Sequence, residues 1–218
     1  MLPNQLRTAR LARGWSQQQA AARLGVTQAY LSMLEHGRRD VAPLARRLMR
    51  VYDLPPTALP IGEGAGRVSD DSLARQLAGF GYPGFSHLRR HTRQVNPAQF
   101  LLTALAQPSL DARVAEALPW VLLQYPELPT DFLVREARVN NLQNRLGFVV
   151  SLARRASGRK ALLPLEQSLA ESKLEREDSL GKQLNDAERR WLRAHRSEEA
   201  KQWNMLSDLR PEALRYAD

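Results

Sequence analysis

The sequence contains no cysteine among its 218 residues, so disulfide bridges and thiolate metal sites are excluded. It also contains no apolar run that approaches the roughly 20 residues of a membrane-spanning helix. Its N-terminus does not have the charged segment followed by a long apolar segment that marks a signal peptide. These absences predict a cytoplasmic protein that does not associate with membranes.

Sequence motifs of enzymes are equally scarce. There is no Gly-x-Ser-x-Gly nucleophile elbow, and no glycine-rich loop follows a predicted strand as in nucleotide-binding proteins. The four histidines have no carboxylate at the spacing of metal ligands. We therefore expect no enzymatic activity, no cofactor and no bound metal.

Acidic residues are nearly absent from the first sixty positions, although the whole chain has 23 of them. This segment contains nine arginines and three acids, Glu35, Asp40 and Asp53, so its net charge is +6. The rest of the chain has a net charge of +3 over a much longer stretch. A general preference for arginine over lysine does not explain why acids are scarce here. A dense positive charge of this kind favours binding to the phosphates of DNA.

The same segment contains a helix-turn-helix pattern between Ser16 and Gly37. Ser16 followed by Gln19 predicts a capping box at the start of a first short helix. Gly25 predicts the end of that helix, because glycine adopts a left-handed backbone at little cost. Thr27 is a typical N-cap for a second helix, which Gly37 would end.

The second helix of this pattern has short or amide side chains on its predicted outer face, and these suit the major groove of DNA. The predicted base contacts are Gln28, Ala29, Ser32 and Met33. The amide of Gln28 can pair with both N6 and N7 of adenine; the alternative for Gln28 is a solvated side chain without a function. The predicted phosphate contacts are Gln17, Arg10, Arg13, Thr27, Arg38 and Arg39.

Further residues at fixed spacing surround this pattern. They are Arg10, Ser16, Gln17, Ala21, Leu24, Gly25, Val26, Thr27, Gln28, Leu31, Leu34, Glu35, Gly37 and the segment Asp53–Leu59. With this set, residues 6–59 resemble the DNA-binding domain of the XRE family, the lambda-repressor and Cro type. The resemblance implies an ion pair between Arg10 and Glu35 that ties the first helix to the third. It also implies that the protein binds double-stranded DNA as a homodimer.

Apolar positions at helical spacing complete the expected organisation of the chain. Residues 1–61 are expected to form a five-helix lambda-repressor-like DNA-binding domain, and residues 62–96 a linker or arm with one short helix. Residues 97–218 are expected to form a larger all-α domain that holds two copies together or binds a protein partner. Its helices are expected at residues 97–106, 110–123, 128–142, 142–156, 162–182, 186–195 and 198–209.

Three functions are compatible with these features. The first is a sequence-specific transcriptional regulator that represses as a dimer on a palindromic operator. The second is an antitoxin-type protein, which binds a toxin through its C-terminal domain and regulates its own operon. The third rests on Arg190 and His195, whose spacing is similar to the Arg-x4-His pair of HEPN-type ribonucleases; those enzymes usually have a polar residue where this chain has Trp191. We expect the first function.

Overall fold

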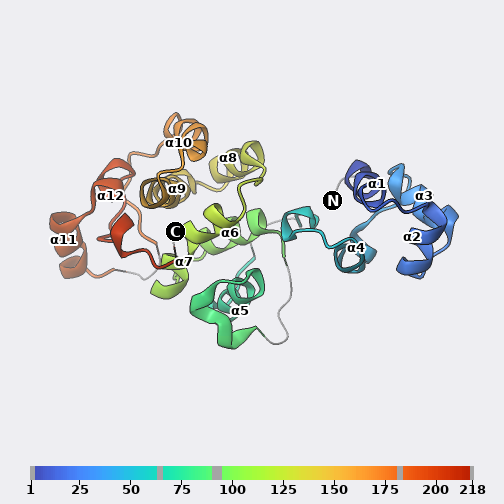
Figure 1. The fold of residues 1–218 in the computed structure, drawn as a ribbon. Helices are drawn as coiled ribbons and strands as arrows, with labels where there is room; N and C mark the ends of the chain where they lie inside the picture. The colour runs from blue at the N-terminus through green and yellow to red at the C-terminus, as the bar shows by residue number, and fades with distance from the viewer. Residues whose placement is uncertain (1–2, 63–65, 90–94, 181–183, 217–218) are drawn as a thin grey trace. The chain divides into compact units, whose positions relative to one another are not determined.

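The structure is a computed structural model that describes residues 3–62, 66–89, 95–180 and 184–216. Within these ranges the regular secondary structure is helical (Figure 1), and the only β-type pairing joins the backbones of Asp178 and Met205. None of the described helices is long and apolar enough to cross a membrane. The predicted all-α fold is confirmed for these residues, with short helices in the first sixty positions followed by further helices.

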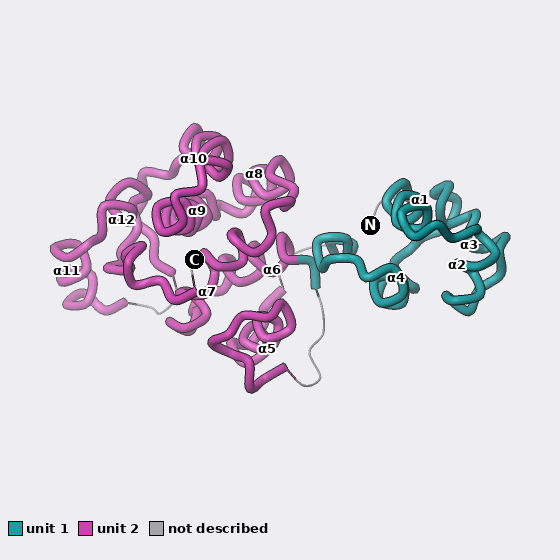
Figure 2. The backbone as a smooth tube through the Cα atoms, viewed as in Figure 1, with its two compact units in different colours: residues 1–62, 94–96 teal, residues 63–93, 97–218 magenta. Residues whose placement is uncertain are grey.

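The chain divides into two compact units (Figure 2). The first contains residues 1–62 and 94–96, and the second contains residues 63–93 and 97–218.

The first unit is a small helical bundle. Its elements are α1 (Pro3–Ala12), α2 (Gln17–Leu24), α3 (Gln28–Glu35), η1 (Ala42–Leu44), α4 (Ala45–Val51) and η2 (Pro56–Ala58). Leucines on the inner faces form one core, and those fully buried are Leu6, Leu24, Leu31, Leu34 and Leu48. The amide of Asn96 donates to the carbonyls of Thr57 and Leu59 at 3.0 and 2.7 Å, which fixes the end of this bundle.

The second unit is larger and is built around α9. Its elements are α5 (Asp70–Phe80), η3 (Pro83–Leu88), α6 (Pro97–Leu105), α7 (Ala112–Gln124), α8 (Thr130–Val139), α9 (Gln143–Ser157), η4 (Lys160–Leu162), α10 (Leu163–Ala170), α11 (Asp186–His195), α12 (Glu198–Gln202) and η5 (Pro211–Ala213). Helix α9 packs against α7, α8, α10 and α12. The fully buried ring of Trp203 lies over Gly147 of α9 and joins the C-terminal segment to this core.

The long helix predicted over residues 162–182 is wrong beyond Ala170, where α10 ends. The cause is a side chain from α9. The amide of Asn144 donates to the carbonyl of Leu174 and accepts the N–H of the same residue, both at 2.8 Å. This tertiary pairing satisfies the backbone groups that a continued helix would have paired.

The helix predicted over residues 198–209 is also too long, because α12 ends at Gln202. Asn204 adopts a positive φ of +54°, which interrupts the helix. The backbone then pairs with Asp178, through the carbonyl of Asn204 at 3.0 Å and the N–H of Leu206 at 2.7 Å. A contact more than twenty residues away in sequence therefore decides where this helix ends.

The short helix expected within residues 62–96 is present as α5, but the described part of this segment is not a free linker, because α5 and η3 pack in the second unit. Tyr82 and Phe85 are buried. The ring centroid of Tyr82 lies 5.3 Å from that of Trp120 and 5.5 Å from that of Tyr216. Aromatic residues that the sequence analysis placed in an arm therefore form part of a core.

Candidate nucleic-acid interface

The turn between α2 and α3 has the caps that the sequence predicts. The hydroxyl of Ser16 accepts the N–H of Gln19 at 3.1 Å, and the side-chain oxygen of Gln19 accepts the N–H of Ser16 at 2.9 Å. Gly25 has a φ of +58°, and a Cβ there would lie 2.5 Å from a guanidinium nitrogen of Arg47. Glycine is therefore favoured by the backbone, whereas the end of the exposed Arg47 side chain could move away from a Cβ. This turn fixes the direction in which α3 leaves α2.

Helix α3 has one face in the core and one face outside it. Its buried residues are Leu31, Leu34 and Glu35. Gln28 and Ala29 are exposed, whereas Ser32 and Met33 are half-buried one turn later. The four predicted base contacts therefore follow one another along the first two turns of α3.

Glu35 is the only acid of α3, and an ion pair holds it away from the outer face. Arg10 donates from Nε and Nη2 to the two carboxylate oxygens at 2.6 and 3.0 Å, and Gln17 donates to one of them at 2.9 Å. The Glu35 side chain is 1% exposed. Burial raises the pKa of Glu35, but the hydrogen bonds from Arg10 and Gln17 outweigh burial and hold this pKa below its usual value. The exposed face of α3 thus has no carboxylate.

The six predicted phosphate contacts fall into two groups. The first group consists of Arg10, Gln17 and Arg13; the second consists of Thr27, Arg38 and Arg39. The side chains of the first group donate hydrogen bonds to other groups of the same domain. Arg13 donates to the carbonyls of Ala9 and Tyr52. Arg10 would reach a phosphate only by breaking its ion pair with Glu35. The second group is exposed, and neither of its arginines has a carboxylate partner among the described residues.

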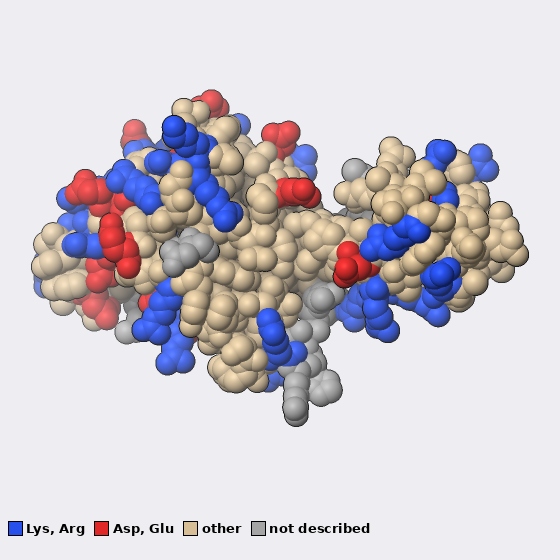
Figure 3. Space-filling model, in the orientation of Figure 1, with Lys and Arg blue, Asp and Glu red and all other residues tan. Residues whose placement is uncertain are grey.

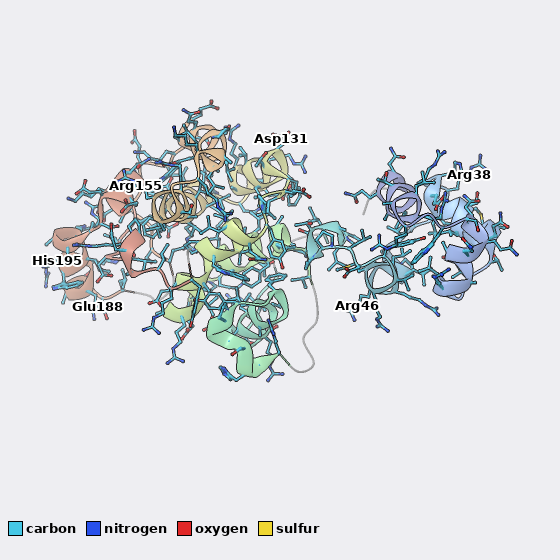
Figure 4. The ribbon with its side chains drawn as sticks, viewed as in Figure 1. Arg38, Arg46, Asp131, Arg155, Glu188 and His195 are labelled. Atoms are coloured by element: carbon cyan, nitrogen blue, oxygen red, sulfur yellow. The ribbon has the colours of Figure 1, made fainter. Side chains whose placement is uncertain are left out.

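Helix α4 adds exposed cations to which the sequence analysis assigned no role. They are Arg46, Arg47 and Arg50. In the described parts of the chain these three side chains have no acidic partner. In Figure 3 most of the first unit is tan, and most of the charged side chains visible on it are basic; Figure 4 labels Arg38 and Arg46 there. The sequence could have indicated these cations, because Arg46 and Arg50 are four positions apart and therefore share one face of a helix.

Arg190 and His195, the pair that is similar to HEPN-type ribonucleases, are both exposed on α11, and Figure 4 labels His195 there. Nδ1 of His195 lies 2.7 Å from the carbonyl oxygen of Trp191, and the two rings stack with centroids 4.3 Å apart. The imidazole is therefore held by its own helix. No group of three or more His, Asp or Glu that could hold a metal ion occurs among the described residues.

The first unit also matches a known protein family. A family model described as a helix-turn-helix domain matches residues 2–60, which include all the elements from α1 to η2. No curated protein and no solved structure matches the chain significantly. A domain of this family suggests a DNA-binding regulator. Residues 2–60 are therefore a helix-turn-helix domain, consistent with the XRE type that the sequence resembles.

Proposed function

We propose that this protein is a sequence-specific transcriptional regulator that acts in the cytoplasm and represses by binding a palindromic operator as a dimer. One observation is the main support. The exposed face of α3 offers the amide of Gln28 and the methyl of Ala29, while Glu35 is buried against Arg10. A recognition helix without an exposed carboxylate can approach the negatively charged groove of DNA without repulsion.

The proposed contacts follow from the chemistry of the major groove. The side-chain oxygen of Gln28 accepts from N6 of adenine while its amide donates to N7, and the methyl of Ala29 packs against a thymine methyl. Arg38 and Arg39, exposed after α3, contact phosphates and fix the position of the domain on the duplex. A palindromic site requires two recognition helices about 34 Å apart, and we assign the dimer interface to residues 97–218.

The test is selection of genomic DNA fragments by the full-length protein at moderate salt, followed by sequencing of the bound fragments. The proposal predicts a repeated, inverted half-site with centres separated by about one helical turn. A uniform recovery of all fragments would contradict it. Recovery of isolated single half-sites would contradict the dimer, and co-purification of a second protein at a fixed ratio would favour the antitoxin-type alternative.

Replacing Gln28 with alanine should weaken binding to the selected site about tenfold to a hundredfold, because a bidentate base contact contributes about 1–3 kcal/mol. Binding to unrelated duplexes should not change, because it depends on phosphates. Titration of a labelled duplex measures both affinities. The matched control is Gln167→Ala, which removes an exposed amide from α10. Equal losses on both duplexes would argue against base recognition by Gln28.

We assign no catalytic role to Arg190 and His195. The purified protein should therefore leave single-stranded RNA intact after prolonged incubation, as judged by gel electrophoresis. His195→Ala, which changes an exposed side chain of α11, should give the same result as the unsubstituted protein. RNA cleavage that disappears in His195→Ala would establish the ribonuclease alternative instead.

A further inference from the structure

His36 continues the outer row of the recognition helix. It is the C-cap residue of α3 and lies four positions after Ser32 and eight after Gln28, so the three residues share one side of the helix. His36 is exposed. Its Nδ1 lies 3.5 Å from the hydroxyl of Ser32, which is a direct contact with a predicted base-reading residue.

The ring of His36 is oriented by a hydrogen bond to its own helix. Nδ1 lies 2.7 Å from the carbonyl oxygen of Ser32, and a carbonyl only accepts hydrogen bonds, so Nδ1 carries a proton. The other nitrogen, Nε2, is then the atom that gains a proton when the ring becomes charged. Imidazole is the side chain whose charge ordinarily changes between about pH 5 and pH 8.

The charged residues next to His36 in the sequence are Glu35 on α3 and Arg38, Arg39 and Asp40 in the following loop. On α1, Arg7 and Arg10 lie close enough to Glu35 to lower its pKa. Glu35 is paired with Arg10, and the carboxylate of Asp40 accepts the N–H of Ala42 at 3.0 Å. Both nearby acids therefore have partners within the fold. A nearby DNA phosphate would favour the charged form of an imidazole.

The length of α3 places His36 near the edge of the groove. His36 lies eight positions after Gln28, a rise of about 12 Å along the helix, and the major groove is about 12 Å wide. When Gln28 reaches the bases, His36 lies towards the wall of the groove, next to the loop that contains Arg38 and Arg39. We propose that His36 is a proton-dependent phosphate contact, so that DNA binding takes up a proton at Nε2 and strengthens as the pH falls. This inference rests on the proposed DNA-binding function.

The test compares the unsubstituted protein with His36→Gln on a mixed-sequence duplex of about 30 base pairs, roughly three helical turns. A phosphate contact also acts on unrelated DNA, so the operator is not needed. Between about pH 8 and about pH 6, at constant ionic strength, the affinity of the unsubstituted protein should rise about threefold to tenfold more than that of His36→Gln. At the lower pH, the slope of log affinity against log salt should be steeper for the unsubstituted protein than for His36→Gln, by about 0.9 for each bound protomer.

Three further measurements keep the outcome decisive. His36→Arg has a permanent charge and should bind tightly at both pH values. His87→Gln changes an exposed histidine of η3 and should keep the full pH dependence. Calorimetry of the unsubstituted protein in two buffers of different ionisation enthalpy counts the protons taken up on binding, which does not require any variant to fold.

The outcomes distinguish the proposed role of His36 from the proposed DNA-binding function. Proton uptake that His36→Gln abolishes supports the phosphate contact. Equal pH dependence in the unsubstituted protein and His36→Gln, or no proton uptake in calorimetry, overturns the role of His36 and leaves DNA binding intact. Absence of DNA binding at every pH overturns the proposed function itself.

Discussion

Glu35→Ala should destabilise the first unit by about 3–5 kcal/mol, because it leaves the buried guanidinium of Arg10 without its carboxylate. Three donors converge on Glu35, two from Arg10 and one from Gln17, and all would lose their acceptor. A loss of this size is a large fraction of the about 5–15 kcal/mol that stabilises a typical domain. Hydrogen exchange of the α1, α2 and α3 amides reports this unit separately from the rest of the chain.

An exposed ion pair provides the control. Asp71 and Arg75 on α5 form a pair at 2.9 Å whose side chains are 64% and 54% exposed. Asp71→Ala should cost no more than about 0.5 kcal/mol, because water screens an exposed pair. The double variant with Arg10→Met and Glu35→Leu should recover most of the stability lost in Glu35→Ala, since it leaves no unpaired buried charge. Similar losses for the exposed and the buried pair would contradict this interpretation.

The pH dependence of stability tests the same pair in a second way. Hydrogen bonds lower the pKa of Glu35 in the folded protein, so the folded state holds the carboxylate charged to lower pH than the unfolded chain does. The stability that Glu35 contributes is therefore fully present above about pH 4.3, the usual pKa of glutamate, and is lost as the pH falls through the lower folded value. Glu35→Gln should weaken this acid dependence in the exchange of α3 amides.

The first unit could be predicted from the sequence because its signals are local. The capping box of Ser16 and Gln19 acts over three residues, and the left-handed backbone of Gly25 is a property of glycine itself. The burial of Leu31 and Leu34 follows from their spacing along one helix face. In each case the residues that decide the structure lie within one helical turn of each other.

The ends of α10 and α12 could not be predicted in the same way. Asn144 pairs with the backbone of Leu174 across thirty positions of sequence, and Asp178 pairs with the backbone next to Asn204. Helix propensity favours continuing both helices, but tertiary hydrogen bonds override a weak local preference. The spacing of apolar residues contains no information about such partners.

The hydrogen-bond partners of the predicted site residues could not all be predicted from the sequence. The sequence analysis predicted Arg13 to be a phosphate contact. The structure instead directs its guanidinium to the carbonyl of Tyr52, 39 positions later, and over the ring of Trp15. Because an arginine has several donors on a long side chain, its partner depends on the fold around it. The exposed Arg38 and Arg39 lack such a partner within the described fold, which supports the proposal that they contact phosphates.

The core of the second unit depends on a close contact between one glycine and one tryptophan. A Cβ at Gly147 would lie 2.3–2.4 Å from three ring atoms of Trp203, so the ring occupies the space that a side chain would need. The indole N–H donates to the hydroxyl of Ser151 at 3.1 Å, and this hydroxyl donates to Glu166 at 2.6 Å. The ring position is therefore fixed by packing on one side and by hydrogen bonds on the other.

Gly147→Ala should consequently destabilise the protein when Trp203 is present and stabilise it when Trp203 is replaced by alanine. In the unsubstituted protein it should destabilise the second unit by about 1–3 kcal/mol, because an added methyl overpacks a filled core. Trp203→Ala alone should cost about 3–5 kcal/mol. In that background Gly147→Ala should stabilise the protein by up to about 1 kcal/mol, since the space is vacant and alanine favours the helix.

Urea unfolding of the four proteins, followed by the exchange of α9 amides, measures this coupling. The control is Trp191→Ala, which removes a tryptophan that is 52% exposed on α11. In that background Gly147→Ala should remain destabilising, because the ring of Trp203 is still in place. If Gly147→Ala has the same effect with and without Trp203, the contact does not determine how α9 packs. The helix would then tolerate a side chain at this position by shifting as a whole, and the loss in Trp203→Ala would come from the cavity alone.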